Sequence, residues 1–352
     1  MRPVKFPHVH TAAVLYYPDL NNKAAEDMAE SVTLPSGAKM PLFGLGTWQA
    51  DDAESLKIAL VTALDAGYRL IDTASIYGNE AIIGEVLESY FKSGKLKRSD
   101  IFITTKLPFY SMDPKDADEL IPKQLANLCT DYVDLYLLHN AAAMKQADPS
   151  KPLDFSPGSF IHQDIPHIET WKVLEKYYKK GNLKALGVSN FNGKQIQELY
   201  NLAEIKPANL QVECHIYWPQ FELHELCKKL NMSFTSYATL GSPGRTKRLG
   251  NHHWPEGNPM QEPLVVQLAQ KYGKTPAQIL LRQMMQRQIV VIPKSTNAAR
   301  VVENANVFDF QLTPAEVQQL NEVKTRVRLF EMRVFKGNKK YPFEDVDLSI
   351  DP

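Results

Sequence analysis

Four side chains suited to acid–base chemistry occur close to the ends of short apolar segments in this sequence. Asp72, Lys106 and His139 each follow such a segment directly, and Tyr77 comes shortly after Asp72. An unperturbed tyrosine hydroxyl titrates near pH ~10, which is high for a proton donor at neutral pH. A nearby ammonium group favours the phenolate, so we expect Lys106 to lower the pKa of Tyr77. We expect Asp72 to keep Lys106 charged and in place.

This set of side chains suits the reduction of a carbonyl group. In that reaction a hydride is added to carbon while Tyr77 donates a proton to oxygen. A neutral His139 imidazole can orient the carbonyl oxygen and stabilise the charge that builds on it. The sequence contains no GxSxG elbow, no HExxH zinc site and no P-loop lysine motif. His252 and His253 are adjacent but lack a third ligand at a metal-binding spacing, so no metal is expected.

The apolar segments are short, rich in β-branched residues and separated by helix-length stretches. This alternation is typical of buried parallel strands with crossover helices. Eight such strands predict a (β/α)8 TIM barrel, in which the C-terminal strand ends build the active site. The expected strands lie near residues 43–48, 68–72, 101–106, 133–139, 183–188, 209–212, 233–237 and 289–292.

Other segments surround this barrel. An N-terminal β-hairpin is expected over residues 33–40, with a turn at Ser36 and Gly37. Two long loops, residues 140–166 and 240–259, are candidate substrate loops, and an irregular C-terminal tail begins near residue 326. Helices are expected over residues 51–66, 79–91, from 113 onward, and over 167–180, 192–203, 275–286, 298–304 and 314–323.

Composition narrows the possible functions. The chain has 352 residues, 44% of them hydrophobic, and a formal net charge of zero, so no basic field recruits nucleic acid or an anionic membrane. No long uncharged apolar stretch predicts a membrane span. Three widely spaced cysteines fit a reducing cytoplasm. We expect a monomer with an N-terminal extension over residues 1–30 and a single domain over residues 31–352.

Several separate motifs then resemble one family. They are Gly44-Leu45-Gly46-Thr47-Trp48, Asp72-Thr73-Ala74-Ser75-Ile76-Tyr77-Gly78-Asn79-Glu80, Gly187-Val188-Ser189-Asn190-Phe191 and Ile292-Pro293-Lys294-Ser295-Thr296. On these residues the chain resembles an aldo-keto reductase of the aldose reductase or aldehyde reductase type. The likeness runs from about residue 32 to residues 341–343.

The resemblance implies a barrel that binds NADPH across its C-terminal face and reduces aldehydes or ketones. It implies Tyr77 as general acid, tuned by Lys106 and Asp72, and His139 as the residue that orients the carbonyl. NADH is a possible secondary cofactor. The cofactor-binding residues implied by the resemblance are Thr47, Trp48, Ser189, Asn190, Gln211, Tyr237, Leu240, Ser242, Lys294, Ser295, Thr296, Arg300, Glu303 and Asn304.

Departures from the family pattern concern the substrate. Trp48, Tyr77, His139 and Asn140 are the expected substrate-binding residues, but Asn140 stands beside the catalytic histidine, where an aromatic residue is common. Pro108 and Lys151 likewise occupy places where the family often has aromatic residues. Fewer aromatic side chains predict a wider or more polar pocket, which favours a small polar or sugar-like aldehyde.

Other interpretations remain open at this level. Taken singly, Asp72 and Lys106 could form a structural ion pair, and His139 could be a hydrogen-bonded structural histidine. An NADPH-binding scaffold without turnover would keep the same fold and the same four residues. A barrel enzyme that acts on sugar phosphates without nicotinamide is a third possibility, although the four-residue set argues against it.

Overall fold

A computed structural model describes residues 30–151, 153–154, 156, 158–245, 254–344 and 346 of the chain. The predicted N-terminal extension, apart from residue 30, and the pair His252 and His253 lie outside the described residues. The predicted hairpin is present: β1 (Ser31–Thr33) pairs with β2 (Lys39–Pro41) in antiparallel register. Gly37 has a φ of 85° in its turn.

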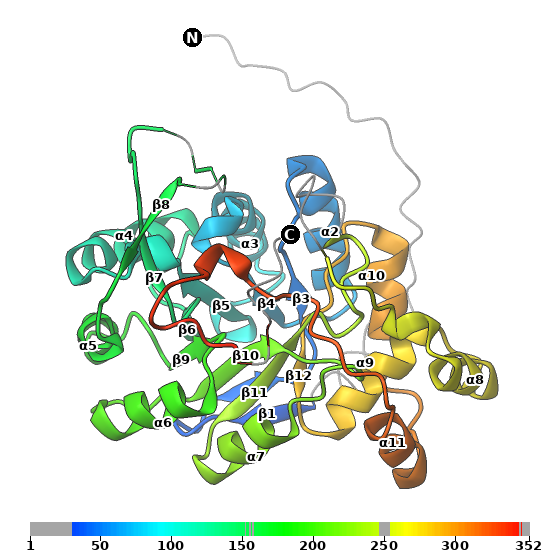
Figure 1. Ribbon diagram of the computed structural model, residues 1–352. Helices are drawn as coiled ribbons and strands as arrows, with labels where there is room; N and C mark the ends of the chain where they lie inside the picture. Colours follow the sequence, from blue (N-terminus) through cyan, green and yellow to red (C-terminus); the bar gives the residue numbers. More distant parts are fainter. Residues whose placement is uncertain are drawn as a thin grey trace.

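Eight parallel strands form the central sheet, in the order predicted (Figure 1). Bridges from Phe43 to Val291 and from Gly46 to Lys294 join the first strand to the last, so the sheet closes into a barrel. The (β/α)8 fold is therefore confirmed. The strands are β3 (Leu45–Gly46), β4 (Leu70–Asp72), β5 (Phe102–Leu107), β6 (Leu135–Leu138), β9 (Leu186–Ser189), β10 (Asn209–Glu213), β11 (Ser233–Tyr237) and β12 (Val290–Val291).

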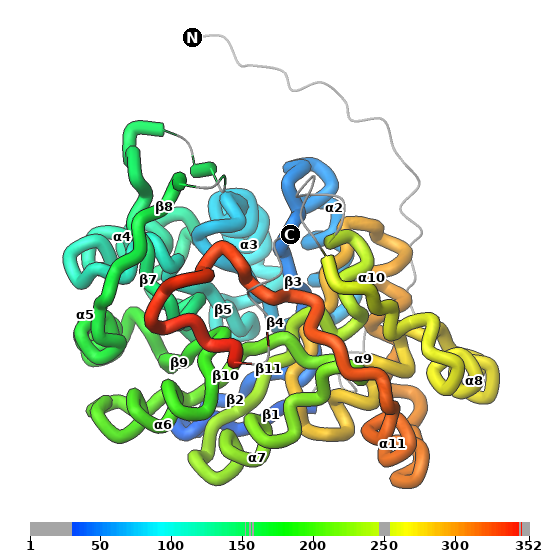
Figure 2. The backbone as a smooth tube through the Cα atoms, viewed as in Figure 1, coloured from blue at the N-terminus to red at the C-terminus, as the bar shows by residue number. Residues whose placement is uncertain are grey.

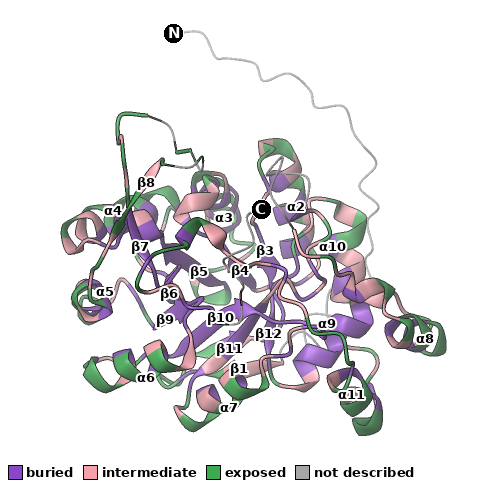
Figure 3. Ribbon diagram, in the orientation of Figure 1, coloured by how far each residue is buried: buried purple, intermediate pink, exposed green. Residues whose placement is uncertain are grey.

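Helices surround this barrel, with buried residues toward the strands and exposed residues outside (Figure 3). Local signals place several of their starts, because Asp52, Asp113, Asn192 and Thr275 each accept a hydrogen bond from a first-turn amide. The predicted helices correspond to α2 (Ala53–Asp65), α3 (Glu80–Lys92), α4 (Pro114–Asn127), α5 (His167–Lys179), α6 (Gly193–Leu202), α9 (Pro276–Gln286), α10 (Ala298–Ala305) and α11 (Pro314–Asn321).

Within the part of the chain that the structure describes, two α-helices were not predicted from the sequence. They are α7 (Phe221–Lys229) and α8 (Pro263–Tyr272). The N-cap of α7 is Gln220 in the left-handed conformation, and neither N-cap side chain makes a capping hydrogen bond. Pro263 in the first turn of α8 is a local start signal that the sequence reading passed over. α7 packs against β11 and α8 packs against α9, and this packing supplies most of their stability.

The segment over residues 140–166, predicted as a long substrate loop, contains regular structure that the sequence did not indicate. This segment contains a second antiparallel hairpin, β7 (Ala143–Gln146) with β8 (Phe160–Gln163). Its strands are short and its connection long, so no turn motif marks it in the sequence. The hairpin packs beside the 3₁₀ turn η4 (Phe109–Ser111), and Met144, Phe160, Phe109 and Phe335 form one apolar cluster there.

The C-terminal tail crosses the face of the barrel where the strands end (Figure 2, red). It contains the short turn η7 (Arg333–Phe335) and is held by long-range hydrogen bonds. Asn338 Nδ2 donates to Ala143 O at 2.8 Å, and Asn192 Nδ2 donates to Pro342 O at 3.1 Å. Among the described residues, no helix combines the length and apolar character needed to cross a membrane.

Candidate active site

One large cavity, of about 1550 Å³, opens at the C-terminal ends of the barrel strands. Every predicted site residue lines it except Lys106, which lies fully buried beneath its floor. From the predicted set the lining includes Thr47, Trp48, Asp72, Tyr77, His139, Asn140, Ser189, Asn190, Gln211, Tyr237, Leu240, Ser242, Lys294, Ser295, Thr296, Arg300, Glu303 and Asn304. Parallel strands that end on one rim explain why residues so distant in the sequence meet here.

A charged cluster occupies the cavity floor. Lys106 Nζ lies 2.6 Å from Asp72 Oδ1, 2.8 Å from Thr73 O and 3.4 Å from Tyr77 Oη. Gln211 Nε2 donates to Asp72 Oδ2 at 2.7 Å. A contact between Gln211 and a cofactor amide stays a prediction. The structure gives Gln211 a further role. It donates a hydrogen bond to one oxygen of the Asp72 carboxylate, while Lys106 binds the other oxygen, and so it helps to orient that carboxylate.

The expected lowering of the Tyr77 pKa was wrong for this arrangement. Burial raises the pKa of Tyr77 well above its ordinary value of 10, and the negative charge of Asp72 raises it further. Burial also lowers the pKa of Lys106 below 10.5, although Asp72 opposes that shift. The expectation rested on the ammonium alone and omitted the cost of burying a phenolate. Tyr77 is accordingly a protonated phenol at neutral pH.

His139 stands beside this tyrosine at the end of β6. Its ring is 5.7 Å from the Tyr77 ring, centroid to centroid, with the two planes near perpendicular. Burial lowers the pKa of His139 well below 6.5, and the neighbouring Lys106 lowers it further. A neutral imidazole and a protonated phenol therefore face the same space, which is the arrangement needed to bind a carbonyl oxygen and protonate it.

The end of β9 presents a polar group to the same cavity. Asn190 adopts a φ of 60°, and its Nδ2 donates to His139 O at 2.9 Å and to Ser189 Oγ at 3.1 Å. Tyr237 Oη donates to Asn190 Oδ1 at 2.7 Å. Asparagine tolerates this left-handed backbone better than most residues. The network fixes the Tyr237 ring at the wall, where a planar group could stack on it.

The other end of the cavity is cationic. Lys294, Ser295 and Thr296 follow β12, and Arg300 lies in the first turn of α10, whose N-cap is Asn297. A lysine, an arginine and a helix N-terminus suit a phosphate group. Because the amide and hydroxyl groups of Ser189 and Asn190 line the same large cavity, the residues present fit an extended dinucleotide.

A loop after β11 borders this channel. Leu240, Ser242 and Gly244 line the cavity, and buried Arg245 ties the two limbs of the loop together. Its Nη1 donates to Gly241 O at 2.7 Å and its Nη2 donates to Pro255 O at 2.9 Å. Sequence reasoning missed Arg245, because its partners are backbone carbonyls rather than a recognisable motif.

The expectation of few aromatic side chains around the substrate was wrong. Trp48 is joined in the cavity lining by four aromatic side chains that were not identified from the sequence: Phe109, Trp254, Phe330 and Phe335. Lys151 is instead exposed and lies 3.5 Å from Asp148. Phe109 lies two residues after the end of β5, beside Pro108, so its position near a strand end could have been read from the sequence. The others come from a long loop and the tail, where position along the sequence does not show which side chains turn inward.

A second buried network lies behind the catalytic cluster. Glu80 Oε1 accepts hydrogen bonds from Thr105 Oγ1 at 2.5 Å and from Gln124 Nε2 at 2.9 Å. Tyr136 Oη donates to Gln124 Oε1 at 2.5 Å. Burial raises the pKa of Glu80, and the Lys106 charge opposes that shift. Glu80 belongs to the motif that begins at Asp72, although no role was predicted for it.

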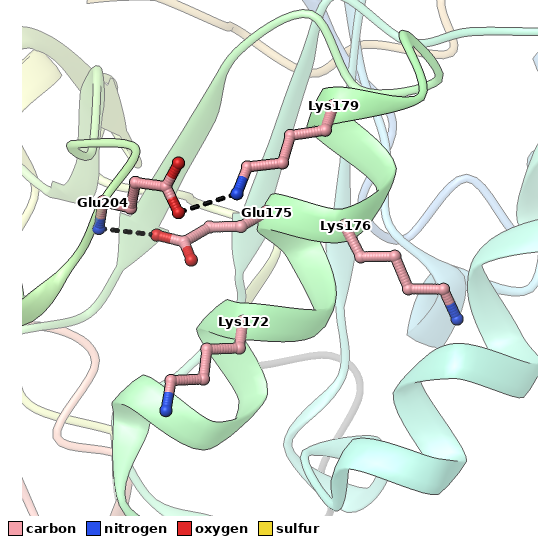
Figure 4. A pocket seen from close by; sticks show the side chains of 5 residues that line it. All are labelled: Lys172, Glu175, Lys176, Lys179 and Glu204. Atoms are coloured by element: carbon pink, nitrogen blue, oxygen red, sulfur yellow. Dashed lines mark hydrogen bonds and ion pairs between the residues drawn. The ribbon is translucent and has the colours of Figure 1, made fainter.

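Within the described ranges, no group of three or more His, Cys, Asp or Glu residues could hold a metal ion. A shallow hollow on the outside of the barrel is lined by Lys172, Glu175, Lys176, Lys179 and Glu204 (Figure 4). Lys179 lies 2.7 Å from Glu204 and Lys176 lies 2.6 Å from Asp118, so these charges are paired on an outer helix surface far from the catalytic cluster.

The barrel and its lysine–carboxylate–tyrosine floor define a class of oxidoreductase, and comparison with known proteins agrees. The profile of the Aldo/keto reductase family matches residues 42–325. The chain belongs to the aldo/keto reductase family, whose members reduce carbonyl compounds.

Among its relatives, the chain is 42% identical over 315 residues to Aldo-keto reductase family 1 member A1 of Mus musculus, a match that covers 89% of this chain and 95% of the relative. The Homo sapiens protein of the same name is 41% identical over 315 residues, with the same coverage. The solved aldose reductase of Schistosoma japonicum superposes with a TM-score of 0.81 at 38% identity, covering 90% of this chain and 99% of that one.

Proposed function

We propose that this protein reduces aldehydes, and ketones of similar shape, to alcohols with NADPH, using Tyr77 as the general acid. The observation that carries the proposal is the floor of the cavity, where Tyr77 Oη lies 3.4 Å from the buried ammonium of Lys106 and beside the ring of His139. NADPH, when bound, supplies the hydride that reduces the carbonyl carbon.

The chain's own residues supply the proton and the orientation. His139 is neutral and holds the carbonyl oxygen toward Tyr77 Oη. As negative charge builds on that oxygen, the Tyr77 hydroxyl gives up its proton. Lys106 stabilises the resulting phenolate. Asp72 and the carbonyl oxygen of Thr73 accept hydrogen bonds from Lys106 and keep it in place, and Gln211 donates a hydrogen bond to Asp72. Because these dipoles and charges are fixed before the reaction, they stabilise the transition state without reorganising.

The residues that would hold NADPH are those of the sequence prediction. Ser189 and Asn190 offer hydrogen-bonding groups for an amide, Tyr237 offers a ring, and Lys294 with Arg300 offers two cations for a phosphate. The last pair favours NADPH over NADH, because the two cofactors differ by that phosphate. The aromatic side chains around Trp48 favour a substrate with an apolar or aromatic substituent on the aldehyde rather than a sugar.

The direct test is oxidation of NADPH, followed by its absorbance, with aldehydes from glyceraldehyde and xylose to benzaldehyde derivatives and a steroid ketone. Turnover with preference for the aromatic aldehydes is expected. Tyr77→Phe should lower kcat at least about 100-fold and leave NADPH affinity within about twofold, because only the proton donor is lost. Ordinary activity in that variant would rule out Tyr77 as the acid.

The cofactor assignment is tested with Lys294→Met. This variant should weaken NADPH binding about tenfold or more and leave NADH binding nearly unchanged, because only NADPH carries the additional phosphate. Fluorescence titration of each cofactor measures both constants. Equal weakening of NADPH and NADH would contradict a phosphate contact at Lys294.

The alternative of a cofactor-binding scaffold is separated by the same assays. NADPH binding without turnover on the whole panel would support it, and the open cavity beside Tyr77 argues against it. We further propose that residues 31–352 act as one unit and as a monomer, since the closed barrel leaves its sheet paired on all sides. Free thiols at Cys129, Cys214 and Cys227 favour a reducing compartment such as the cytoplasm.

A further inference from the structure

One buried carboxylate at the rim of the barrel takes no part in the proposed proton transfer. Glu213 ends β10, two residues after Gln211, and is 1% exposed. A charge in such a place is costly unless its oxygens are fully hydrogen-bonded. Its location therefore raises the question of which groups it binds.

The partners of Glu213 come from the C-terminal tail. Its Oε1 accepts a hydrogen bond from Leu329 N at 2.5 Å, and its Oε2 accepts one from Phe330 N at 3.0 Å. His215 Nε2 lies 2.8 Å from Oε1, so the side chain of the next residue but one completes the set. Two consecutive amides of an irregular segment are thus held by one carboxylate that is fixed in the barrel.

One of the two residues held in this way, Phe330, lies at the centre of an aromatic wall that it forms with Trp48, Tyr237 and Trp254. The Phe330 ring lies 5.6 Å from Trp48, 5.6 Å from Tyr237 and 5.5 Å from Trp254, centroid to centroid and edge to face. These rings come from three separate rim segments. Edge-to-face contacts depend strongly on ring placement, so a shift of the Phe330 backbone would open the wall.

β10 therefore carries two tethers with different partners. Gln211 holds Asp72 of the catalytic floor, and Glu213 holds the tail that covers it. Residues i and i+2 of a strand point to the same side. One rigid strand thus fixes the distance between the proton donor and the wall against which a substrate would rest.

We propose that Glu213, supported by His215, is a positioning residue for the substrate. It tethers the tail at Leu329 and Phe330, and it thereby sets the affinity for aldehydes that carry an apolar group. Its kinetic consequence rests on the proposed reductase activity, but the tether itself does not.

The first measurement is amide hydrogen exchange of the full-length protein. Glu213→Gln keeps the shape of the side chain but removes the charge that two amides share, so exchange at residues 329–330 should accelerate at least about tenfold. The matched control is Glu175→Gln on α5 (Figure 4), where Glu175 Oε1 likewise accepts two consecutive amides, Glu204 N at 2.8 Å and Ile205 N at 3.0 Å. That control should accelerate exchange at residues 204–205 and leave the tail unchanged.

The second measurement is steady-state kinetics with an aromatic aldehyde. Glu213→Gln should raise KM about tenfold while kcat and NADPH affinity change less than about threefold, and Glu175→Gln should change none of them. In a Phe330→Ala background, Glu213→Gln should add less than about twofold to KM, because both act through the same ring. His215→Asn, which leaves the carboxylate in place, should shift KM and tail exchange in the same direction by less.

Three results would each overturn the proposal: unchanged tail exchange in Glu213→Gln, an unchanged KM, or an effect that adds fully to that of Phe330→Ala. If Glu213→Gln does not fold, His215→Asn decides the question by the same criteria. If the wild-type protein shows no turnover, the proposed function fails, and tail exchange together with binding of the aldehyde, measured by tryptophan fluorescence, still tests the tether.

Discussion

At the scale of single residues, the site depends on a buried lysine whose charge is paired with a buried carboxylate. Lys106 is fully enclosed and lies between the carboxylate of Asp72 and the Glu80 network. Removing one partner of a buried pair leaves an uncompensated charge, which costs more than the pair contributes. The pair therefore resists rearrangement, and Tyr77 keeps a defined donor geometry beside it.

A prediction about pH follows from the two groups that face the substrate. The pKa of His139 is lowered well below 6.5, so this ring stays neutral as the pH falls through the ordinary histidine range. The pKa of Tyr77 is raised well above 10, so the phenol stays protonated in moderate alkali. We expect kcat/KM for aldehyde reduction to vary less than about threefold between about pH 6 and pH 9.

The measurement is a pH–rate profile with a saturating and a limiting aldehyde concentration, checked for protein stability at each pH. A tenfold decline centred between about pH 6 and 7 would mean that His139 titrates there, against the direction of its pKa shift. A profile of Tyr77→Phe serves as the background, since its residual rate lacks the proton donor.

At the scale of elements, the ends of the barrel strands carry the catalytic residues, and the loops and the C-terminal tail form the walls of the cavity above them. The local signals for most helices are side-chain caps, whereas the hairpin β7–β8 and the tail are placed by contacts with distant residues. Glu316 combines a local helix cap with contacts to another helix. It completes a capping box with Thr313 at the start of α11 and also binds Lys271 and Tyr272 of α8, at 2.5 Å and 2.6 Å.

The stability of α11 should consequently depend on pH. Burial alone would raise the pKa of Glu316, but hydrogen bonds from Lys271, Tyr272 and Thr313 outweigh it and lower the pKa to about 2. A carboxyl whose folded pKa is depressed stabilises the fold above its ordinary pKa of 4.5 and loses that contribution as pH falls toward 2. Glu316→Gln should lower the free energy of unfolding by about 1 kcal/mol at pH 7.

Denaturant unfolding of both proteins at pH 7 and at pH 3 measures this difference, which should shrink at the lower pH. Glu222→Gln provides the control, because Glu222 is also a first-turn glutamate but is exposed on α7. An equal loss at both pH values would show that the charge of Glu316 is not the source of its contribution.

At the scale of the whole molecule, closure of the barrel places its first strand, β3, beside its last strand, β12. The seam joins β3 to β12 through Gly46, which bridges to Lys294 and pairs with Asp72 on its other side. A Cβ added at Gly46 would lie 2.5 Å from the carbonyl oxygen of Ile292, a backbone atom that cannot turn away. Glycine is thus required at the point where the cationic end of the cavity meets the catalytic floor.

Gly46→Ala should destabilise the protein by about 2–3 kcal/mol, because the seam must open to admit the methyl group. It should also weaken NADPH binding, since Lys294 lies on that seam. Thermal unfolding and cofactor titration measure the two effects. Gly193→Ala is the control, because its added Cβ would meet only Leu226 Cδ2 at 3.4 Å and Leu223 Cδ2 at 3.7 Å, and it should change stability by less than about 0.5 kcal/mol. An unchanged melting temperature in Gly46→Ala would refute the seam argument.

The sequence by itself determined the eight strands, most helices and the identity of the residues on the cavity floor. These depend on local patterns, since a buried strand must be apolar and a helix start must satisfy its free amides. Only the tertiary structure decided the net pKa shift of Tyr77, the aromatic wall around Phe330 and the hold of Glu213 on the tail. Burial and contacts between segments far apart in the chain decide these features, and neither leaves a periodic trace in the sequence.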